Sequence, residues 1–212
     1  VGGGTYEILT TKRDYILQND GVDIEVKAVL ERNLDRVRQL GIDESLVAKD
    51  IDEIVSNPDI QIVAEFFGGV EPARSFLIKA LENGKSVVTA NKEMLAKSWQ
   101  DLEKAGRKGG AGIYFEASCV GGVPIIRTLT EAMQGNRMTS LKGIVNGTTN
   151  YILNRMINAG LSFEQALAEA QEKGYAERDP SADVDGIDAM RKIIILTAIA
   201  TGKLVPDSAV YA

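Results

Sequence analysis

The sequence contains no histidine and only one cysteine, Cys119. Because histidine is the commonest side chain for proton transfer near neutral pH, any acid–base chemistry has to use Lys, Asp, Glu, Tyr, Cys or water. A single cysteine excludes an intrachain disulfide and a cysteine-rich metal site. The lack of disulfides is typical of a reducing compartment, so we expect a cytoplasmic protein.

Long apolar runs and an excess of basic charge are also missing. The longest apolar stretches, such as Ile193–Ala200, are too short to cross a bilayer, and the glycine-rich start Val1–Thr5 is unlike a secretory leader. The net charge of -6 is opposite in sign to the basic excess that nucleic-acid-binding proteins usually carry. We therefore expect neither a membrane nor a nucleic acid as a partner.

Apolar runs of strand length alternate with helical patterns over the first half of the 212 residues. The expected strands are Ile24–Leu30, Ile60–Phe66, Ser86–Thr89 and Gly112–Phe115. The expected helices are Thr5–Gln18, Asn33–Leu40, Pro72–Asn83 and Glu93–Gly106. Apolar strands separated by helices indicate a buried parallel sheet of βαβ units. The predicted fold class is therefore α/β, with a dinucleotide-binding, Rossmann-type parallel sheet.

The pattern changes after Glu116, where we expect the start of an α+β domain. The predicted elements are helices at Pro124–Gln134, Tyr151–Ala159, Ser162–Lys173 and Ile187–Thr201, and a strand at Met138–Val145. Ser162 and Gln165 have capping-box spacing. We divide the chain into a dinucleotide-binding domain, residues 1–118, and part of a second domain, residues 119–212.

Three segments are suited to bind a cofactor or substrate. Glycines in Val1–Gly4 precede a helix and would let a pyrophosphate approach the backbone, although a flexible chain end has the same composition. Gly68-Gly69 end an expected strand and either lie against a nicotinamide ring or form a simple tight turn. Lys92 follows another strand, where it either orients a substrate or is merely solvated, since ligands of open parallel sheets lie beyond the carboxyl ends of the strands.

The segment Glu116–Pro124 combines a carboxylate with a glycine-containing turn. Its oxygen ligands suit a hard cation, whereas a plain hinge between domains would contain the same glycines. Cys119 in this segment is a candidate nucleophile toward an aldehyde, although no histidine is present to activate it.

The segment Gly174–Lys192 places several carboxylates ahead of an expected helix. Asp188 and Lys192 are four residues apart on that helix, which puts them within ion-pair reach. A carboxylate beside a lysine either holds the ammonium in place or helps to relay its proton. A calcium loop is excluded, because its first position would be Ser181 and its closing acidic position would be Lys192. An acidic, solvated helix start is the remaining alternative.

Six strings of the sequence carry a resemblance to a known family. They are Phe67–Gly69 with Glu71–Ala73, Val88–Lys92, Glu116–Ser118, Gly121–Ile126, Gly143–Leu153 and Gly174–Lys192. In this order, and over nearly the whole chain, they closely resemble homoserine dehydrogenase. The last two strings are the most specific.

The resemblance implies NAD(P)-dependent interconversion of L-homoserine and L-aspartate 4-semialdehyde, a step in threonine, methionine and isoleucine biosynthesis, by a homodimer. It implies catalytic roles for Lys192, Asp188 and Lys92. It implies substrate binding by Glu177, Asp183 and Thr148. It implies cofactor contacts from Val1, Gly2, Arg32, Gly68, Gly69, Thr89, Lys92, Gly174 and Glu177. It implies a sodium ion held by Glu116 and by the carbonyls of Cys119, Gly121 and Val123.

The sequence departs from the family pattern at both ends and at one internal position. It begins inside the glycine loop, without the first strand of the sheet, and stops before the family's catalytic domain is complete, so we expect a fragment of a longer chain. Cys119 stands where the family usually has Val or Ala. Two alternatives remain open: a fragment that folds without turnover, and a Cys119-dependent semialdehyde dehydrogenase.

The choice of cofactor depends on the residues after the second expected strand. Glu31 could accept a hydrogen bond from a ribose 2′-hydroxyl, whereas Arg32 could hold a 2′-phosphate. The resemblance places an arginine here, so we expect NADP, with NAD as the alternative.

Overall fold

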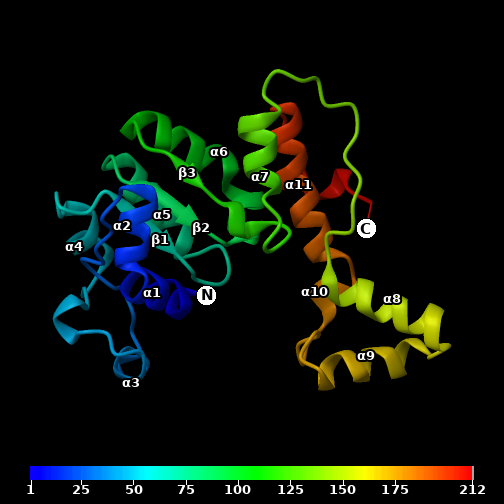
Figure 1. The fold of residues 1–212 in the computed structure, drawn as a ribbon. Helices are drawn as coiled ribbons and strands as arrows, with labels where there is room; N and C mark the ends of the chain where they lie inside the picture. The colour runs from blue at the N-terminus through cyan, green and yellow to red at the C-terminus, as the bar shows by residue number, and fades with distance from the viewer. Residues whose placement is uncertain (212) are drawn as a thin grey trace. The chain divides into compact units, whose positions relative to one another are not determined.

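The computed structural model describes residues 1–211, and their contacts divide them into two compact units. The first unit comprises Val1–Asn91 and Gln100–Tyr114, and the second comprises Lys92–Trp99 and the residues from Phe115 onward (Figure 1). Within residues 1–211, no helix is both long and apolar enough to span a membrane.

The first unit is built on a parallel sheet in the order β1-β2-β3. Its strands are β1 (Ile62–Glu65), β2 (Ser86–Thr89) and β3 (Ile113–Tyr114), with Ile62 paired to Ser86 and Val87 to Ile113. Helix α5 (Ala73–Glu82) connects β1 to β2, and α6 (Lys92–Gly109) connects β2 to β3. This arrangement confirms the predicted α/β class, since parallel neighbours need a crossover connection.

Helix α5 packs against β1 and β2 because its apolar residues fall on one face. Leu77 and Leu81, one turn apart, are fully buried, as is Val87 of β2. At the far end of α6, a Cβ on Gly109 would lie 1.8 Å from the carbonyl oxygen of Leu81. Glycine is therefore required there, where the backbones of two helices approach each other closely.

The N-terminal part of the first unit is helical, and one predicted strand there is wrong. Its elements are α1 (Gly2–Thr11), α2 (Arg13–Asp20), α3 (Leu34–Gln39), a 3₁₀ turn at Glu44–Leu46 and α4 (Ile51–Ser56). The expected helix Thr5–Gln18 is present as α1 and α2, separated at Lys12. The expected strand Ile24–Leu30 is only an isolated parallel bridge between Val29 and Val47. Its alternating burial follows an extended chain, but no other described strand lies alongside it to complete a ladder.

The regular elements among the described residues of the second unit are all helical. They comprise a 3₁₀ turn at Glu116–Ser118, α7 (Ile125–Arg127) continued by a π turn at Thr128–Ala132, α8 (Gly147–Ala159), α9 (Phe163–Glu172), α10 (Ser181–Val184), α11 (Ile187–Thr201) and a 3₁₀ turn at Asp207–Ala209. Helices α8 and α9 pack against each other around Ile152, Ala166 and Ala170 (Figure 1).

Two predictions for this unit have different outcomes. The capping box at the start of α9 is confirmed, because Gln165 N–H donates to Ser162 Oγ and Ser162 N–H donates to Gln165 Oε1. The strand expected at Met138–Val145 is wrong: these residues form an extended loop without ladder partners. A strand needs a neighbour, and no other strand is present among the described residues of this unit.

Candidate active site

A pocket of about 590 Å³ opens in the second unit where the start of α8, the loop after α9 and helices α10 and α11 come together. Most of its lining residues have polar or charged side chains, and the full set is Asn146, Gly147, Thr148, Asn150, Tyr151, Asn154, Gly174, Tyr175, Asp183, Asp188 and Lys192. A concave site with several converging polar groups is the usual setting of a small polar substrate.

Asp188 lies at the centre of this site between two lysines. Its Oδ2 accepts a hydrogen bond from Lys192 Nζ at 2.6 Å, and its Oδ1 lies 3.0 Å from Lys92 Nζ. Lys192 Nζ also donates to the carbonyl of Val145 at 2.6 Å. The side chain of Asp188 is 8% exposed and that of Lys192 is 13% exposed, whereas Lys92 is 36% exposed. The expected ion pair across one turn of α11 is thus present, and Lys92 completes a lysine–carboxylate–lysine cluster.

The first turns of α6 hold Lys92 in this cluster. Glu93, the next residue, forms an ion pair with Arg191 of α11 at 2.7 Å. Further along the same helix segment, the ring of Trp99 packs edge-on against Phe115, with centroids 5.1 Å apart. The position of Lys92 therefore depends on packing and charge within the second unit.

Asn146, at the N-terminus of α8, was not anticipated from the sequence. Its Nδ2 donates to Asp183 Oδ1 at 2.7 Å and to Asp188 Oδ2 at 2.8 Å. Its Oδ1 caps α8 by accepting from the backbone N–H of Thr149. The spacing of Asn146 and Thr149, which is that of an N-cap and the third helical residue, was the signal available in the sequence.

The electrostatics of the cluster keep Asp188 ionised at neutral pH. Burial alone would raise the pKa of the Asp188 carboxyl, but hydrogen bonds from Lys192, Asn146 and Lys92 outweigh it and hold the pKa below its ordinary value. Burial has the opposite result at Cys119, where it raises the pKa of the thiol despite the hydroxyl of Ser118 and the two lysines. A buried thiol with a raised pKa is a poor nucleophile, which argues against a Cys119-dependent mechanism.

Two aromatic rings form one wall of the pocket. Tyr151 and Tyr175 pack with ring centroids 4.7 Å apart. The hydroxyl of Tyr151 donates to Glu169 on α9, and hydrogen bonds from Lys173, Arg155 and Tyr151 lower the pKa of Glu169 to about 2. The carboxylate of Glu169 thus stays ionised and fixes the outer edge of this wall.

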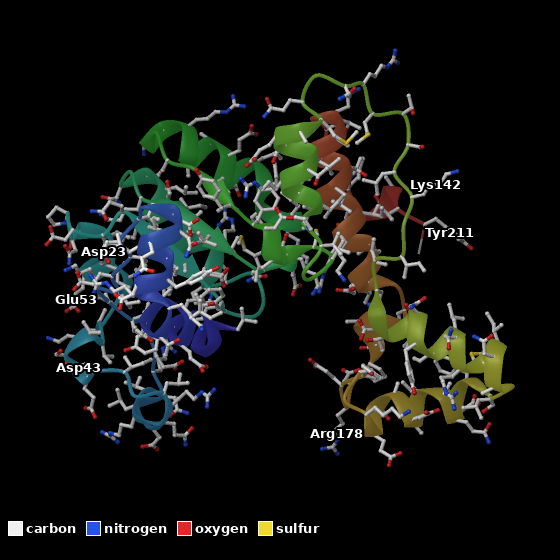
Figure 2. The ribbon with its side chains drawn as sticks, viewed as in Figure 1. Asp23, Asp43, Glu53, Lys142, Arg178 and Tyr211 are labelled. Carbon is white, nitrogen blue, oxygen red and sulfur yellow. The ribbon has the colours of Figure 1, made fainter. Side chains whose placement is uncertain are left out.

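The predicted substrate residues are not all in the pocket. Thr148 and Asp183 line it, and Thr148 Oγ1 donates to the carbonyl of Tyr175 at 2.8 Å. Glu177 is exposed and outside the lining, and its carbonyl accepts a hydrogen bond from Gln171 Nε2. The next residue, Arg178, is also exposed, and Figure 2 shows its side chain extending away from the loop.

Two predicted cofactor residues of the first unit, Gly69 and Thr89, belong to a hydrogen-bond network around a buried carboxylate, which was also not anticipated. Glu65, at the end of β1, is 3% exposed and accepts hydrogen bonds from the hydroxyl of Thr89 at 2.5 Å and the N–H of Phe67 at 2.5 Å. Asn91 Nδ2 donates to the carbonyl of Gly69 at 2.7 Å. The loop after β1 is therefore tied to the end of β2. Thr89 as a whole is 1% exposed, and its hydroxyl is used on Glu65.

The remaining predicted cofactor residues lie at exposed or tightly turning positions. Val1 is 85% exposed, and a Cβ on Gly2, the first residue of α1, would lie 3.2 Å from the ring of Phe66. Arg32 is exposed just before α3, and Gly68 follows β1. Gly174 lines the pocket of the second unit with a φ of 74°.

The residues expected to hold sodium form a cap and a tight turn. Both carboxylate oxygens of Glu116 accept backbone N–H groups at the start of α7, from Ile126 at 3.0 Å and Arg127 at 2.7 Å. Val120 and Gly121 are consecutively left-handed, with φ of 57° and 56°. A left-handed valine is rare, so this turn is held by its surroundings.

Within residues 1–211 no group of three or more His, Cys, Asp or Glu side chains could hold a metal. A cation here would therefore depend on the carbonyls of Cys119, Gly121 and Val123 together with Glu116. Such a set of hard oxygen donors is chemically suited to sodium or calcium rather than to a transition metal.

Comparison with known proteins identifies the family. Residues 1–116 match the family model described as the NAD binding domain of homoserine dehydrogenase, and residues 124–212 match that described as homoserine dehydrogenase. The chain belongs to the homoserine dehydrogenase family. It therefore combines a dinucleotide-binding domain of this family with part of a homoserine dehydrogenase domain.

Relatives of the family cover nearly all of this chain. It is 46% identical to homoserine dehydrogenase of Synechocystis sp. over 204 residues, which are 95% of this chain and 46% of the relative. It is 40% identical to that of Bacillus subtilis over 199 residues, 94% of this chain and 46% of the relative. The chain thus spans about half the length of the curated relatives it matches.

Solved structures agree with this assignment. A homoserine dehydrogenase from Thiobacillus denitrificans has a TM-score of 0.88 and 42% identity, over 98% of this chain and 48% of that chain. A hyperthermophilic archaeal homoserine dehydrogenase, solved in complex with NADPH, has a TM-score of 0.78 and 28% identity, over 91% of this chain and 66% of that one.

Proposed function

We propose that this chain supplies the dinucleotide-binding and catalytic groups of a homoserine dehydrogenase, which interconverts L-homoserine and L-aspartate 4-semialdehyde in threonine, methionine and isoleucine biosynthesis. The observation that carries the proposal is the Lys92–Asp188–Lys192 cluster, of which Asp188 and Lys192 line the pocket, in a chain that belongs to this family. Because the chain has no histidine, a lysine is the natural proton carrier.

The bound nicotinamide supplies or accepts the hydride at C4 of the substrate. Lys192 has three N–H groups, of which two are directed at Asp188 and at the carbonyl of Val145. One remains for a substrate oxygen in the pocket. In the reducing direction the ammonium of Lys192 or Lys92 gives a proton to the aldehyde oxygen as it becomes a hydroxyl, and in the oxidising direction the proton returns to the amine.

The other groups bind and orient the substrate. Asp183 offers a carboxylate to the substrate amine, and Thr148 also lines the pocket. Glu177, which is exposed, belongs to the proposed site through the family resemblance alone. Asp188 stays ionised and holds both ammonium groups in place.

We propose NADP as the preferred cofactor, with NAD as the alternative, because Arg32 is exposed and follows the extended segment that ends near Val29. The similar archaeal structure, solved with NADPH, is in keeping with this choice. Sodium at Glu116 and the turn Cys119–Val123, a homodimer, and the division into residues 1–118 and 119–212 are further parts of the proposal.

The decisive experiment compares the two lysines in the full chain. General acid–base catalysis contributes about 10²–10⁴-fold, and a proton moved with the hydride acts mainly in the transition state. Lys192→Ala should therefore lower kcat by that range in steady-state kinetics in both directions, with little change in cofactor affinity. Lys142→Ala is the control, because Lys142 is exposed and Figure 2 shows it extending away from its loop.

The comparison with Lys92→Ala decides between the two carriers. If Lys192→Ala keeps kcat within a few-fold of the parent while Lys92→Ala abolishes turnover, then Lys192 is only a structural partner of Asp188. Titration with NADPH separates the enzyme from a fragment that folds but does not bind cofactor.

A further inference from the structure

Asn146 connects the two acidic groups of the pocket, and it is not among the groups that move a proton or bind the cofactor in the proposed reaction. It is 7% exposed. Its two amide hydrogens are used on two different carboxylates, Asp183 on α10 at 2.7 Å and Asp188 on α11 at 2.8 Å. Among the described residues, Asp183 receives its side-chain hydrogen bond from Asn146.

The orientation of the Asn146 amide is fixed from both sides. Its Oδ1 accepts from the backbone N–H of Thr149 at 2.8 Å and from the Thr149 hydroxyl at 2.8 Å. The carboxylates on the other side are acceptors and therefore require the Nδ2 end. Reversing the amide would place an oxygen against two carboxylates and an NH₂ group against a backbone N–H, so a single orientation satisfies all four contacts.

We propose that Asn146 is the positioning residue of this site: anchored at the N-terminus of α8, its amide holds the carboxylates of Asp183 and Asp188 toward one point of the pocket. The proposal rests on the proposed function for its kinetic consequences. Asn146 touches neither hydride nor transferred proton, and it acts through the two carboxylates.

A neutral donor is required at this position because the site is already balanced in charge. Lys92 from α6 and Lys192 from α11 face two carboxylates, Asp188 from the same helix and Asp183 from α10. The carbonyl of Val145 and the buried thiol of Cys119, whose pKa is raised, also lie near the cluster and add no charge to it at neutral pH. A third carboxylate would have no ammonium of its own.

Two substitutions separate the cap from the bridge. Asp, Asn and Ser are nearly equivalent as N-caps, so Asn146→Asp and Asn146→Ser both keep an acceptor for Thr149. Asn146→Ser removes the bridge without adding charge. Asn146→Asp replaces the bridging donor by an acceptor and adds a like charge, which raises the pKa of neighbouring carboxyls. Asn158→Asp makes the same change at an exposed position of α8 outside the pocket lining and is the matched control.

In the full chain, Asn146→Ser should raise the KM for homoserine by about tenfold, because the loss of one hydrogen bond to a carboxylate typically costs about that much in affinity. The value of kcat should fall less than the KM rises. Asn146→Asp should shift the acidic limb of the pH profile of kcat/KM upward by about one pH unit. NADPH affinity should be unchanged in both variants. Asn158→Asp should leave the profile and KM at parental values. Parental KM and a parental acidic limb in both Asn146 variants would overturn the proposal.

A second measurement needs no substrate and tests the proposal even if the parent shows no homoserine-dependent turnover, in which case the proposed function alone has failed. A carboxyl whose pKa is higher in the folded state than in the unfolded state destabilises the folded state at pH values above the folded-state pKa. This destabilisation disappears as the pH falls and the carboxyl becomes protonated in both states. The melting temperature of Asn146→Asp should therefore be lower than that of Asn146→Ser at pH 7. The difference between the two melting temperatures should shrink as the pH falls from about 6 to 4. A pH-independent difference would show that the added carboxyl does not sense the cluster and would refute the bridging role.

Discussion

Replacing Asp188 by asparagine removes the one negative charge that two lysines share. Asp188 is 8% exposed and its partner Lys192 13%, so this pair is close to fully buried, whereas the pair with Lys92, 36% exposed, is screened by water. Breaking a buried pair by removing one partner costs about 3–5 kcal/mol. Because Lys192 is partly exposed to solvent and Lys92 is more exposed, we expect a loss of unfolding free energy at the lower end of this range, about 3 kcal/mol. For a chain of this size that loss corresponds to a melting temperature lower by roughly 6–12 °C.

The dependence of this loss on pH follows from the pKa of Asp188. Burial by itself raises that pKa, but contacts with Lys192, Asn146 and Lys92 lower it below its ordinary value of 3.8. A carboxyl with a depressed folded-state pKa contributes stability that is present above pH 3.8 and is lost as the pH falls through the folded-state pKa. The difference between parent and Asp188→Asn should therefore be constant from pH 7 to about 5 and shrink below about pH 4.

The assay is urea unfolding followed by far-ultraviolet circular dichroism at several pH values. Asp185→Asn is the control, because Asp185 is exposed and lies only three residues earlier, outside the pocket lining. Turnover of Asp188→Asn should also fall, since the ammonium groups lose their charged partner. If Asp188→Asn is no less stable than Asp185→Asn at pH 7, the reasoning from burial and charge is wrong.

Two further predictions concern the first unit. Arg32→Ala should weaken NADP binding by about 10–100-fold, because a charge-assisted hydrogen bond to the 2′-phosphate is lost, and should leave NAD binding within about twofold. Equal losses of affinity in titrations with the two cofactors would show that Arg32 does not bind the 2′-phosphate. Glu65→Gln should lower the free energy of unfolding in urea by about 1–3 kcal/mol, because an NH₂ group would face either the Phe67 N–H or the Thr89 hydroxyl. Glu82→Gln, at an exposed site, should stay near the parental value, and a similar small effect at Glu65 would show that its hydrogen bonds contribute little.

The helices were predictable because each has a local pattern of its own. Helix α11 has the predicted bounds Ile187–Thr201, and the capping box at Ser162 lies where the spacing placed it. The buried strand Ser86–Thr89 was also found with its observed bounds. In each case the deciding information lies within a few residues of the element itself.

The errors lie where structure depends on a distant partner. Residues Met138–Val145 have a strand-like pattern, but a pattern cannot say whether another strand lies alongside, and none does among the described residues of this unit. Asn146 was missed for the same reason, since the two carboxylates it bridges are 37 and 42 residues further along the chain. Glu65, a carboxylate in an apolar run, was a visible signal of a buried polar network, but the identity of its donors was not.

Helix α6 is continuous from Lys92 to Gly109, yet its first eight residues belong to one compact unit and its remainder to the other. No single cut in the sequence can therefore yield both units intact. A split after Ser118 would leave Lys92 on one polypeptide and Asp188 on the other. Their ion pair would then form only when the two polypeptides bind each other. A chimera that takes only the later residues from a relative would likewise supply Asp188 and Arg191 from one parent and Lys92 and Glu93 from the other. The charges at the start of α6 and along α11 have to be exchanged as a set.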